Sequence, residues 1–101
     1  MKIAEVKLMT KFLGVVESGR FRILEPKEHC CAVRLTKLIK PKLLDEAAIE
    51  KHQIDLSKDE GMAMIVEGTL GREELWIYEA KVVDRGGPIL SEVVRKVFIG
   101  E

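Results

Sequence analysis

Two pairs of apolar runs, each divided by a short polar turn, dominate the hydrophobic pattern of the chain. The stretch GMAMIVEGTLGREELWIYEAKVVD places β-branched and aromatic residues on both sides of a turn around Gly71 to Glu74, as in a β-hairpin. KFLGVVESGRFRILEP has the same form and turns at Ser18-Gly19. A further run, HCCAVRLTKL, follows Pro26 and predicts a third strand before the second hairpin.

Helical spacing replaces this alternation between the two groups of strands. In PKLLDEAAIEKHQ, Pro41 suits the first turn, acidic residues come early, and Lys51 and His52 come late. These charges suit the dipole of a helix. Residues 1–13 form either another helix or an early strand. The apolar positions that share one face of the central helix are Leu43, Leu44, Ala47 and Ala48.

Three strands, one helix and two strands is the order of the OB-fold, a small five-stranded Greek-key barrel. Gly14 then falls within the first strand, where a barrel must bend sharply and a glycine is tolerated. We therefore predict a mainly β (β+α) domain with one inserted helix and a C-terminal amphipathic helix. Its parts are an extension over 1–13, a barrel over 14–84 and a helix over 88–99. The alternative is an α+β sheet packed on one layer of helices.

Strand parity predicts which side chains point into the barrel, because successive side chains of a strand point to opposite faces. Glu79 and Lys81 share one face of the last strand, so we assign its opposite face to the core. The same test places Arg22 and Arg34 outside. The predicted inward residues are Phe21, Ile23, Cys31, Val33, Leu35, Met62, Met64, Val66, Leu70, Trp76, Tyr78, Ala80 and Val82.

The C-terminal stretch GPILSEVVRKVFIG predicts an amphipathic helix. A turn over residues 84–87 ends the last strand, and Pro88 suits the first helical position. Apolar residues then recur at steps of one and three along a single stripe, with Glu92, Arg95 and Lys96 behind it. The apolar stripe consists of Ile89, Leu90, Val93, Val94, Val97 and Phe98.

Such a stripe is expected to be covered, since even half-burying six side chains of this size contributes on the order of 5 kcal/mol. Parity leaves Ile65, Leu75 and Ile77 as an apolar patch outside the barrel. We expect the helix to dock on this patch, because consecutive elements usually pack together. The alternative is that it meets the same helix of a second subunit across a two-fold axis.

The second half of the chain also resembles a known group of proteins. IDLSKDEGMAMIVEGTL followed by WIYEAKVVDRGGPILSEVVRKVF has an acidic-Gly start, a WIY-A strand and a GPIL helix. These features are similar to those of small single-domain bacterial and archaeal proteins of uncharacterised function with an OB-fold-like strand order. The resemblance implies a shared fold and no particular activity. Glu79 departs from it, at a place where the group would have a small polar residue.

Composition narrows the classes of partner. The 101 residues suit one domain, and 17 Lys+Arg against 17 Asp+Glu give a formal net charge of zero. No global field therefore draws the protein to nucleic acid or to an anionic membrane. Glu5 and Lys7 interrupt any apolar core of a signal peptide, and no run approaches the roughly 18 apolar residues of a membrane span. We expect a cytoplasmic protein.

The candidates for metal or redox chemistry are weak. His29 precedes Cys30 and Cys31, but neighbouring strand residues point to opposite faces, so the three cannot easily share an ion. His52 lies on a distant helix. We interpret Cys31 as a small core residue and Cys30 as half-exposed, both reduced.

The stretch DLSKDEG resembles the opening of a calcium loop, with oxygens at Asp55, Ser57 and Asp59. Gly61 comes one place late, however, and Val66 stands where the loop needs a bidentate glutamate. A turn into the next strand is the better interpretation. With no phosphate loop, metalloprotease helix or nucleophile motif present, we assign no catalytic residue, no metal site and no cofactor.

Two binding functions remain. The first is association with a protein partner or a second copy, through the apolar stripe, the outer patch or a sheet edge. The second is single-stranded nucleic acid on a basic groove of OB type. The alternative for the basic residues is pairing with Glu25, Glu67 and Glu79 across the strands. The candidate nucleic-acid residues are Arg20, Arg22, Arg34, Lys37, Lys40 and Lys42.

Overall fold

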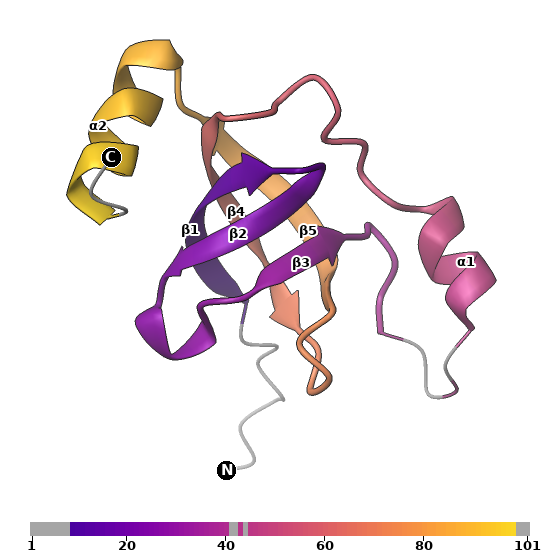
Figure 1. The fold of residues 1–101 in the computed structure, drawn as a ribbon. Coiled ribbons are helices and arrows are strands. Elements are labelled where there is room, and N and C mark those ends of the chain that lie inside the picture. The colour runs from indigo at the N-terminus through magenta and orange to yellow at the C-terminus, as the bar shows by residue number, and fades with distance from the viewer. Residues whose placement is uncertain (1–8, 41–42, 44, 99–101) are drawn as a thin grey trace, which may run out of the picture.

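The computed structural model describes residues 9–40, 43 and 45–98 (Figure 1). Its architecture is mainly β with two short helices, as the hydrophobic pattern predicts. Both hairpins, the inserted helix and the C-terminal helix are present. The elements are β1 (Thr10–Glu17), β2 (Arg20–Glu25), the 3₁₀ turn η1 (Lys27–His29), β3 (Ala32–Leu35), α1 (Glu46–Lys51), β4 (Ala63–Leu70), β5 (Trp76–Arg85) and α2 (Pro88–Phe98).

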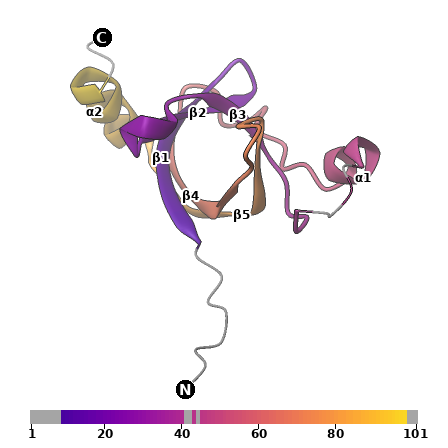
Figure 2. The same cartoon turned by 90° about the horizontal axis from the view of Figure 1, so that it is seen from below.

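The five strands form one mixed sheet that closes into a ring in the order β1-β2-β3-β5-β4. All neighbouring pairs are antiparallel except β3 and β5, which are parallel. Viewed along the ring in Figure 2, α1 and α2 lie outside it on opposite sides, with α2 beside β1. The closed ring with a helix on each side differs from the α+β alternative, in which a sheet packs on one layer of helices.

The first strand bends at Gly14, where its pairing with β2 changes register. A Cβ atom at Gly14 would lie 2.6 Å from Cζ of Phe21 and would collide with the carbonyl oxygen of Arg22. Only glycine allows this close approach, as the sequence predicts. The strand starts at Thr10, so residues 10–13 of the predicted extension are strand; residues 1–8 and 99 lie outside the described part.

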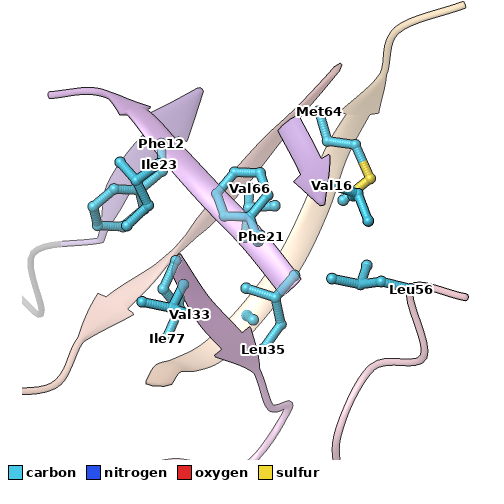
Figure 3. Close-up of a cluster of buried hydrophobic side chains, with 11 residues drawn as sticks. Phe12, Val16, Phe21, Ile23, Val33, Leu35, Leu56, Met64, Val66 and Ile77 are labelled. Carbon is cyan, nitrogen blue, oxygen red and sulfur yellow. The ribbon is translucent and has the colours of Figure 1, made fainter. Parts of the chain in front are cut away.

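Apolar side chains from all five strands fill the ring (Figure 3). Leu56, from the segment after α1, joins them from one end. Cys31, Leu70 and Val82 pack against this core, as parity predicts. The buried core consists of Phe12, Val16, Phe21, Ile23, Val33, Leu35, Leu56, Met64, Val66, Ile77 and Ala80.

One part of the parity prediction is wrong, because β5 contains a bulge at Glu79. This residue has a left-handed backbone, with φ 51°, and the register with β4 shifts between Glu67 and Thr69. An extra residue reverses the alternation of faces. Ile77 consequently points into the core with 0% exposure, instead of forming part of an outer patch.

Trp76 and Tyr78 lie on the other face of β5 and are buried outside the ring. They pack with Ile49 of α1 and with Leu38. Their predicted burial is confirmed, but α1 covers them and they do not belong to the barrel core. Met62 is a second correction: it precedes β4, so parity does not extend to it, and it lies half-buried beside Ser91 of α2.

The central helix is shorter than predicted. It begins at Glu46, and Asp45 caps it by accepting a hydrogen bond from the Ala48 amide at 3.2 Å. Asp45 thereby satisfies one of the first N–H groups of α1, which have no partner within the helix. Leu43 is 85% exposed, and Ile49 is the buried residue of α1. Residues 41, 42 and 44 lie outside the described part.

The predicted turn before β4 is confirmed. The Ser57 amide donates to the Asp55 carboxylate at 2.9 Å, and the Asp59 amide donates to the Leu56 carbonyl at 2.9 Å. Gly61 then takes a left-handed backbone, with φ 79°. The polar residues of DLSKDEG thus build a turn that holds Leu56 against the core.

Candidate functional site

The helix α2 packs on the outside of the ring. Val94 is 7% exposed and forms a buried cluster with Val15, Leu24 and Ala63. The predicted docking of this helix on the barrel is confirmed, but its partners are different. Because the bulge in β5 turns Ile77 inward, the predicted outer patch does not exist as one surface.

The other two members of the predicted patch are separated. Leu75 is 55% exposed and lines a recess with Arg34 and Trp76. Ile65 pairs with Leu13 across β1 and β4 and lies half-buried beside α2. Only Ile65 therefore contributes to the surface around the C-terminal helix.

A polar anchor that sequence reasoning missed fixes α2 to β4. The Ser91 hydroxyl accepts a hydrogen bond from the Ala63 amide at 2.8 Å, and Ser91 is 2% exposed. The first amide of β4 is thereby satisfied in a buried place. The one signal in the sequence is a small polar residue between two apolar turns of the stripe.

Docking leaves part of the stripe in water. Val93 and Val97 are 50% and 71% exposed, although Val94 between them is buried. The two residues are four positions apart, so they are neighbours on one side of the helix. The backbones of Ile89, Leu90 and Phe98 belong to α2, but their side chains lie outside the described part of the structure.

A small apolar recess of about 200 Å³ lies against the docked side of α2. Asp84 and Gly86 form the rest of its wall. A second, shallow recess shares Leu13 and Ile65 and extends along β1 to Glu25 and Pro26. We call the first recess the α2 groove; its apolar lining is Leu13, Ala63, Met64, Ile65 and Val94.

Of the described candidate nucleic-acid residues, Arg20 and Arg34 line one recess, together with Trp76 and the carboxylates Glu46 and Glu50. Arg22 pairs with Glu17 at 3.2 Å, and Lys40 pairs with Glu73 at 3.6 Å. Arg20 lines the recess near Trp76, Lys37 is exposed, and Lys42 lies outside the described residues.

Arg34 is held in place by several contacts. It donates to Gln53 at 2.7 Å, pairs with Glu50 at 3.4 Å, and its guanidinium lies 4.3 Å from the centroid of the Trp76 ring. Pairing of basic residues with carboxylates was the expected alternative to a binding groove. The partners in these contacts are Glu17, Glu50 and Glu73, whereas the predicted ones were Glu25, Glu67 and Glu79.

Buried Tyr78 joins the β4–β5 loop to the segment after β3. Its hydroxyl donates to Glu73 at 2.7 Å, and the Lys40 ammonium lies 5.8 Å from the centroid of its ring. Burial, the hydrogen bond to Glu73 and the Glu73 charge raise the pKa of Tyr78 to about 12. Burial raises the pKa of Glu73, but the bond from Tyr78 and the nearby Lys40 outweigh it, so the net pKa is lowered.

This pair makes a spectroscopic prediction, because Tyr78 is the only tyrosine of the chain. The tyrosine of the unfolded chain ionises near pH 10. At that pH, Tyr78 of the folded protein should remain protonated and show no phenolate absorbance. Because folding raises the pKa of Tyr78, the protonated tyrosine stabilises the folded protein below about pH 10. This contribution to the free energy of unfolding is lost as the pH rises toward the folded pKa of about 12. A pH titration at the phenolate band, with and without denaturant, measures both.

Glu73→Gln is the matched variant for this titration. It keeps the size of the side chain and removes its charge, so the folded pKa of Tyr78 should fall toward the ordinary value. For Glu73, whose pKa is lowered by folding, the pH dependence is reversed. Its ionised carboxylate stabilises the folded protein above the unfolded pKa, and this contribution is lost as the pH falls. An unchanged tyrosine titration in Glu73→Gln would show that the contact with Glu73 is not formed.

The cysteines are free. Cys31 packs against the core as predicted, although it is only partly buried, and Cys30 is exposed where half-exposure was predicted. Cys30 donates weakly to the Leu24 carbonyl at 3.7 Å. Burial, together with the charge of Glu74 and the neighbouring Cys30, raises the pKa of the Cys31 thiol. His29 approaches Glu74 instead, at 3.6 Å. Within the described ranges, no three His, Cys, Asp or Glu side chains are grouped as metal ligands.

The described helices include none that is long and apolar enough to cross a membrane. In comparisons with protein-family models, curated proteins and solved structures, nothing matches the chain. Its function must therefore be inferred from its own surface. Among the described residues, Val93 and Val97 are exposed apolar side chains of α2, and the α2 groove has a mostly apolar lining.

Proposed function

We propose that the protein is a non-catalytic binding module with an OB-type fold, and that it recognises a polypeptide through α2. The observation that carries this proposal is the exposure of Val93 and Val97 on a helix that is already docked. Intramolecular packing uses Val94 and leaves these two apolar side chains in water. Exposed apolar surface beside a recess is typical of protein-interaction sites.

Strand order supports the OB assignment. The ring order β1-β2-β3-β5-β4, the parallel β3–β5 pair and the helix between β3 and β4 are the arrangement expected of that barrel. Fold alone does not select a ligand, so the choice between protein and nucleic acid rests on the surface.

The surface favours a polypeptide over single-stranded nucleic acid. Recognition of a single strand uses bases stacked on exposed aromatic rings along a basic track. Here Trp76 and Tyr78 are buried, and Arg34 covers the Trp76 ring. Carboxylates accompany Arg22, Arg34 and Lys40, which reduces the attraction for phosphate. The α2 groove, by contrast, has an apolar lining suited to an aliphatic side chain.

Photo-cross-linking tests the proposal. A benzophenone amino acid is placed at Val97 of the full chain, and the control carries it at Lys51, an exposed position on α1. We expect a discrete polypeptide adduct from position 97 that is absent from position 51. The adduct should disappear when Val93→Asp is added, because the charge would have to be buried at the contact.

A binding experiment with the purified full chain distinguishes polypeptide binding from single-stranded nucleic-acid binding. Fluorescence anisotropy with a mixed-sequence single-stranded oligonucleotide should show no saturable binding, even at low salt. Binding that falls steeply with salt and is lost in Arg22→Ala/Arg34→Ala would support the nucleic-acid function. If position 97 yields no polypeptide adduct dependent on Val93, the proposed function is wrong.

A further inference from the structure

We infer that the polypeptide bound at α2 is a second copy of this chain, joined across a two-fold axis. This inference rests on the proposed function and specifies its partner. In a two-fold interface the same patch faces itself, so it must supply both a projecting and a receiving element. The exposed Val93 and Val97 of α2 supply the first, and the α2 groove, lined in part by Val94 of the same helix, supplies the second.

The projecting element is the ridge formed by Val93 and Val97. With about 100° between successive helical residues, Val97 lies about 60° around the axis from Val94. Val94 itself lines the α2 groove. Figure 2 shows α2 at the outside of the ring, with no other described element beyond it. The ridge of one copy can therefore approach the groove of another without displacing any described element.

The receiving element is the α2 groove, whose lining is mostly apolar and therefore suits valine side chains. Leu13 and Ile65 are paired across β1 and β4 and form the floor beside α2. Asp84 is the one charged residue in its lining. Two such contacts, related by the two-fold axis, would cover Val93 and Val97 of both copies and remove the apolar surface that docking leaves exposed.

Charge favours the approach of a second copy more than that of a highly charged partner. The chain has 17 basic and 17 acidic residues, so two copies do not repel each other over long distances. On the neighbouring side of α2, Glu92 and Lys96 pair with each other at 3.2 Å. An antiparallel pair of α2 helices thus meets no unbalanced charge from these two residues.

The size of the surface sets the expected strength. The helix has 11 residues and is therefore about 16 Å long. A contact of this length belongs to the smaller class of interfaces, below about 1,200 Å² in total. We therefore expect a monomer–dimer equilibrium in the micromolar range rather than a permanent dimer, insensitive to salt because apolar contacts carry it.

Sedimentation equilibrium of the full chain between about 10 μM and about 1 mM tests this inference. We expect Val97→Asp to raise the dimer dissociation constant at least tenfold. The matched control is Ile39→Asp, which changes a similarly exposed side chain, 59% against 71%, on the segment after β3. The control should change the constant less than about twofold. Because both side chains are exposed, both variants should fold, as circular dichroism would show.

Isotope-filtered NMR on a mixture of labelled and unlabelled protein locates the contact. Val97 methyl groups of one copy should give cross-peaks to Leu13 or Ile65 methyl groups of the other. A monomer at every concentration, or a dimer that Val97→Asp leaves unchanged, overturns the inference. If the chain is monomeric while position 97 still cross-links to a different polypeptide, the proposed function stands and only self-association is wrong.

Discussion

Replacing Ile77 by alanine is expected to lower the free energy of unfolding by about 2–5 kcal/mol, a range typical of large buried aliphatic residues. Ile77 is 0% exposed and lies in the core with Val33, Leu35 and Val66. Truncation would leave a cavity in the ring as well as losing apolar burial. The loss is a large part of the roughly 5–15 kcal/mol that stabilises an ordinary domain.

Leu75→Ala is the control, since Leu75 lies two residues before Ile77, just ahead of β5, and is 55% exposed. Its effect should stay within about 0.5 kcal/mol. Urea denaturation of both variants measures the difference directly. Uninterrupted alternation along β5 predicts Ile77 outside the barrel, so a near-neutral Ile77→Ala would contradict the bulge at Glu79.

Gly14→Ser should have the second-largest effect, a loss of about 3 kcal/mol, at the upper end for an overpacked site. Any Cβ atom at this position would meet Cζ of Phe21 at 2.6 Å and the carbonyl oxygen of Arg22. The carbonyl belongs to β2 and cannot move aside without disturbing the pairing of the two strands. The new side chain would therefore strain the bend of β1.

Gly87→Ser provides the matched comparison. No atom lies within 4 Å of a Cβ built at Gly87, and serine is a preferred residue directly before a helix. Thermal unfolding should show Gly87→Ser close to the parent protein and Gly14→Ser clearly less stable. Equal stability of the two variants would mean that β1 does not approach β2 at Gly14 as closely as the structure has it.

Local signals explain how much of the fold is predictable from the sequence. Alternation and turn residues such as Ser18-Gly19 depend on neighbouring positions only, so strands and hairpins follow from them. The inward faces of β2, β3 and β4 are predicted correctly because side chains alternate without a break along each strand. Phe21, Val33 and Met64 accordingly lie in the core. The stripe of α2 is visible for the same reason.

The errors have a tertiary origin. Nothing about Glu79 as a residue type announces a left-handed backbone, and the bulge is possible because Gly68 faces it. A Cβ at Gly68 would collide with the Ile77 side chain and lie 2.8 Å from the Tyr78 carbonyl oxygen. Once β5 changes face, Ile77 leaves the predicted patch. The docking surface of α2 therefore could not be predicted correctly.

The candidate site was predictable in part. Helical periodicity identifies Val93 and Val97 as apolar surface, but only the packed structure shows that Val94 is used and that they are not. The acid partners of Arg22 and Arg34 depend on how β1 and α1 come to lie beside them. Such pairings require the fold and cannot be predicted from strand alternation.

Ring closure also has a consequence for how the chain folds. The β1–β2 hairpin is local, but β1 reaches β4 through pairs such as Val15 with Ala63, and β3 reaches β5 through Arg34 with Trp76. Contacts at such sequence separation slow folding to milliseconds or seconds. During synthesis, β1 to β3 leave the ribosome before their partners exist, with both edges of that half-sheet open. The unclosed chain is then the state most prone to edge-to-edge aggregation.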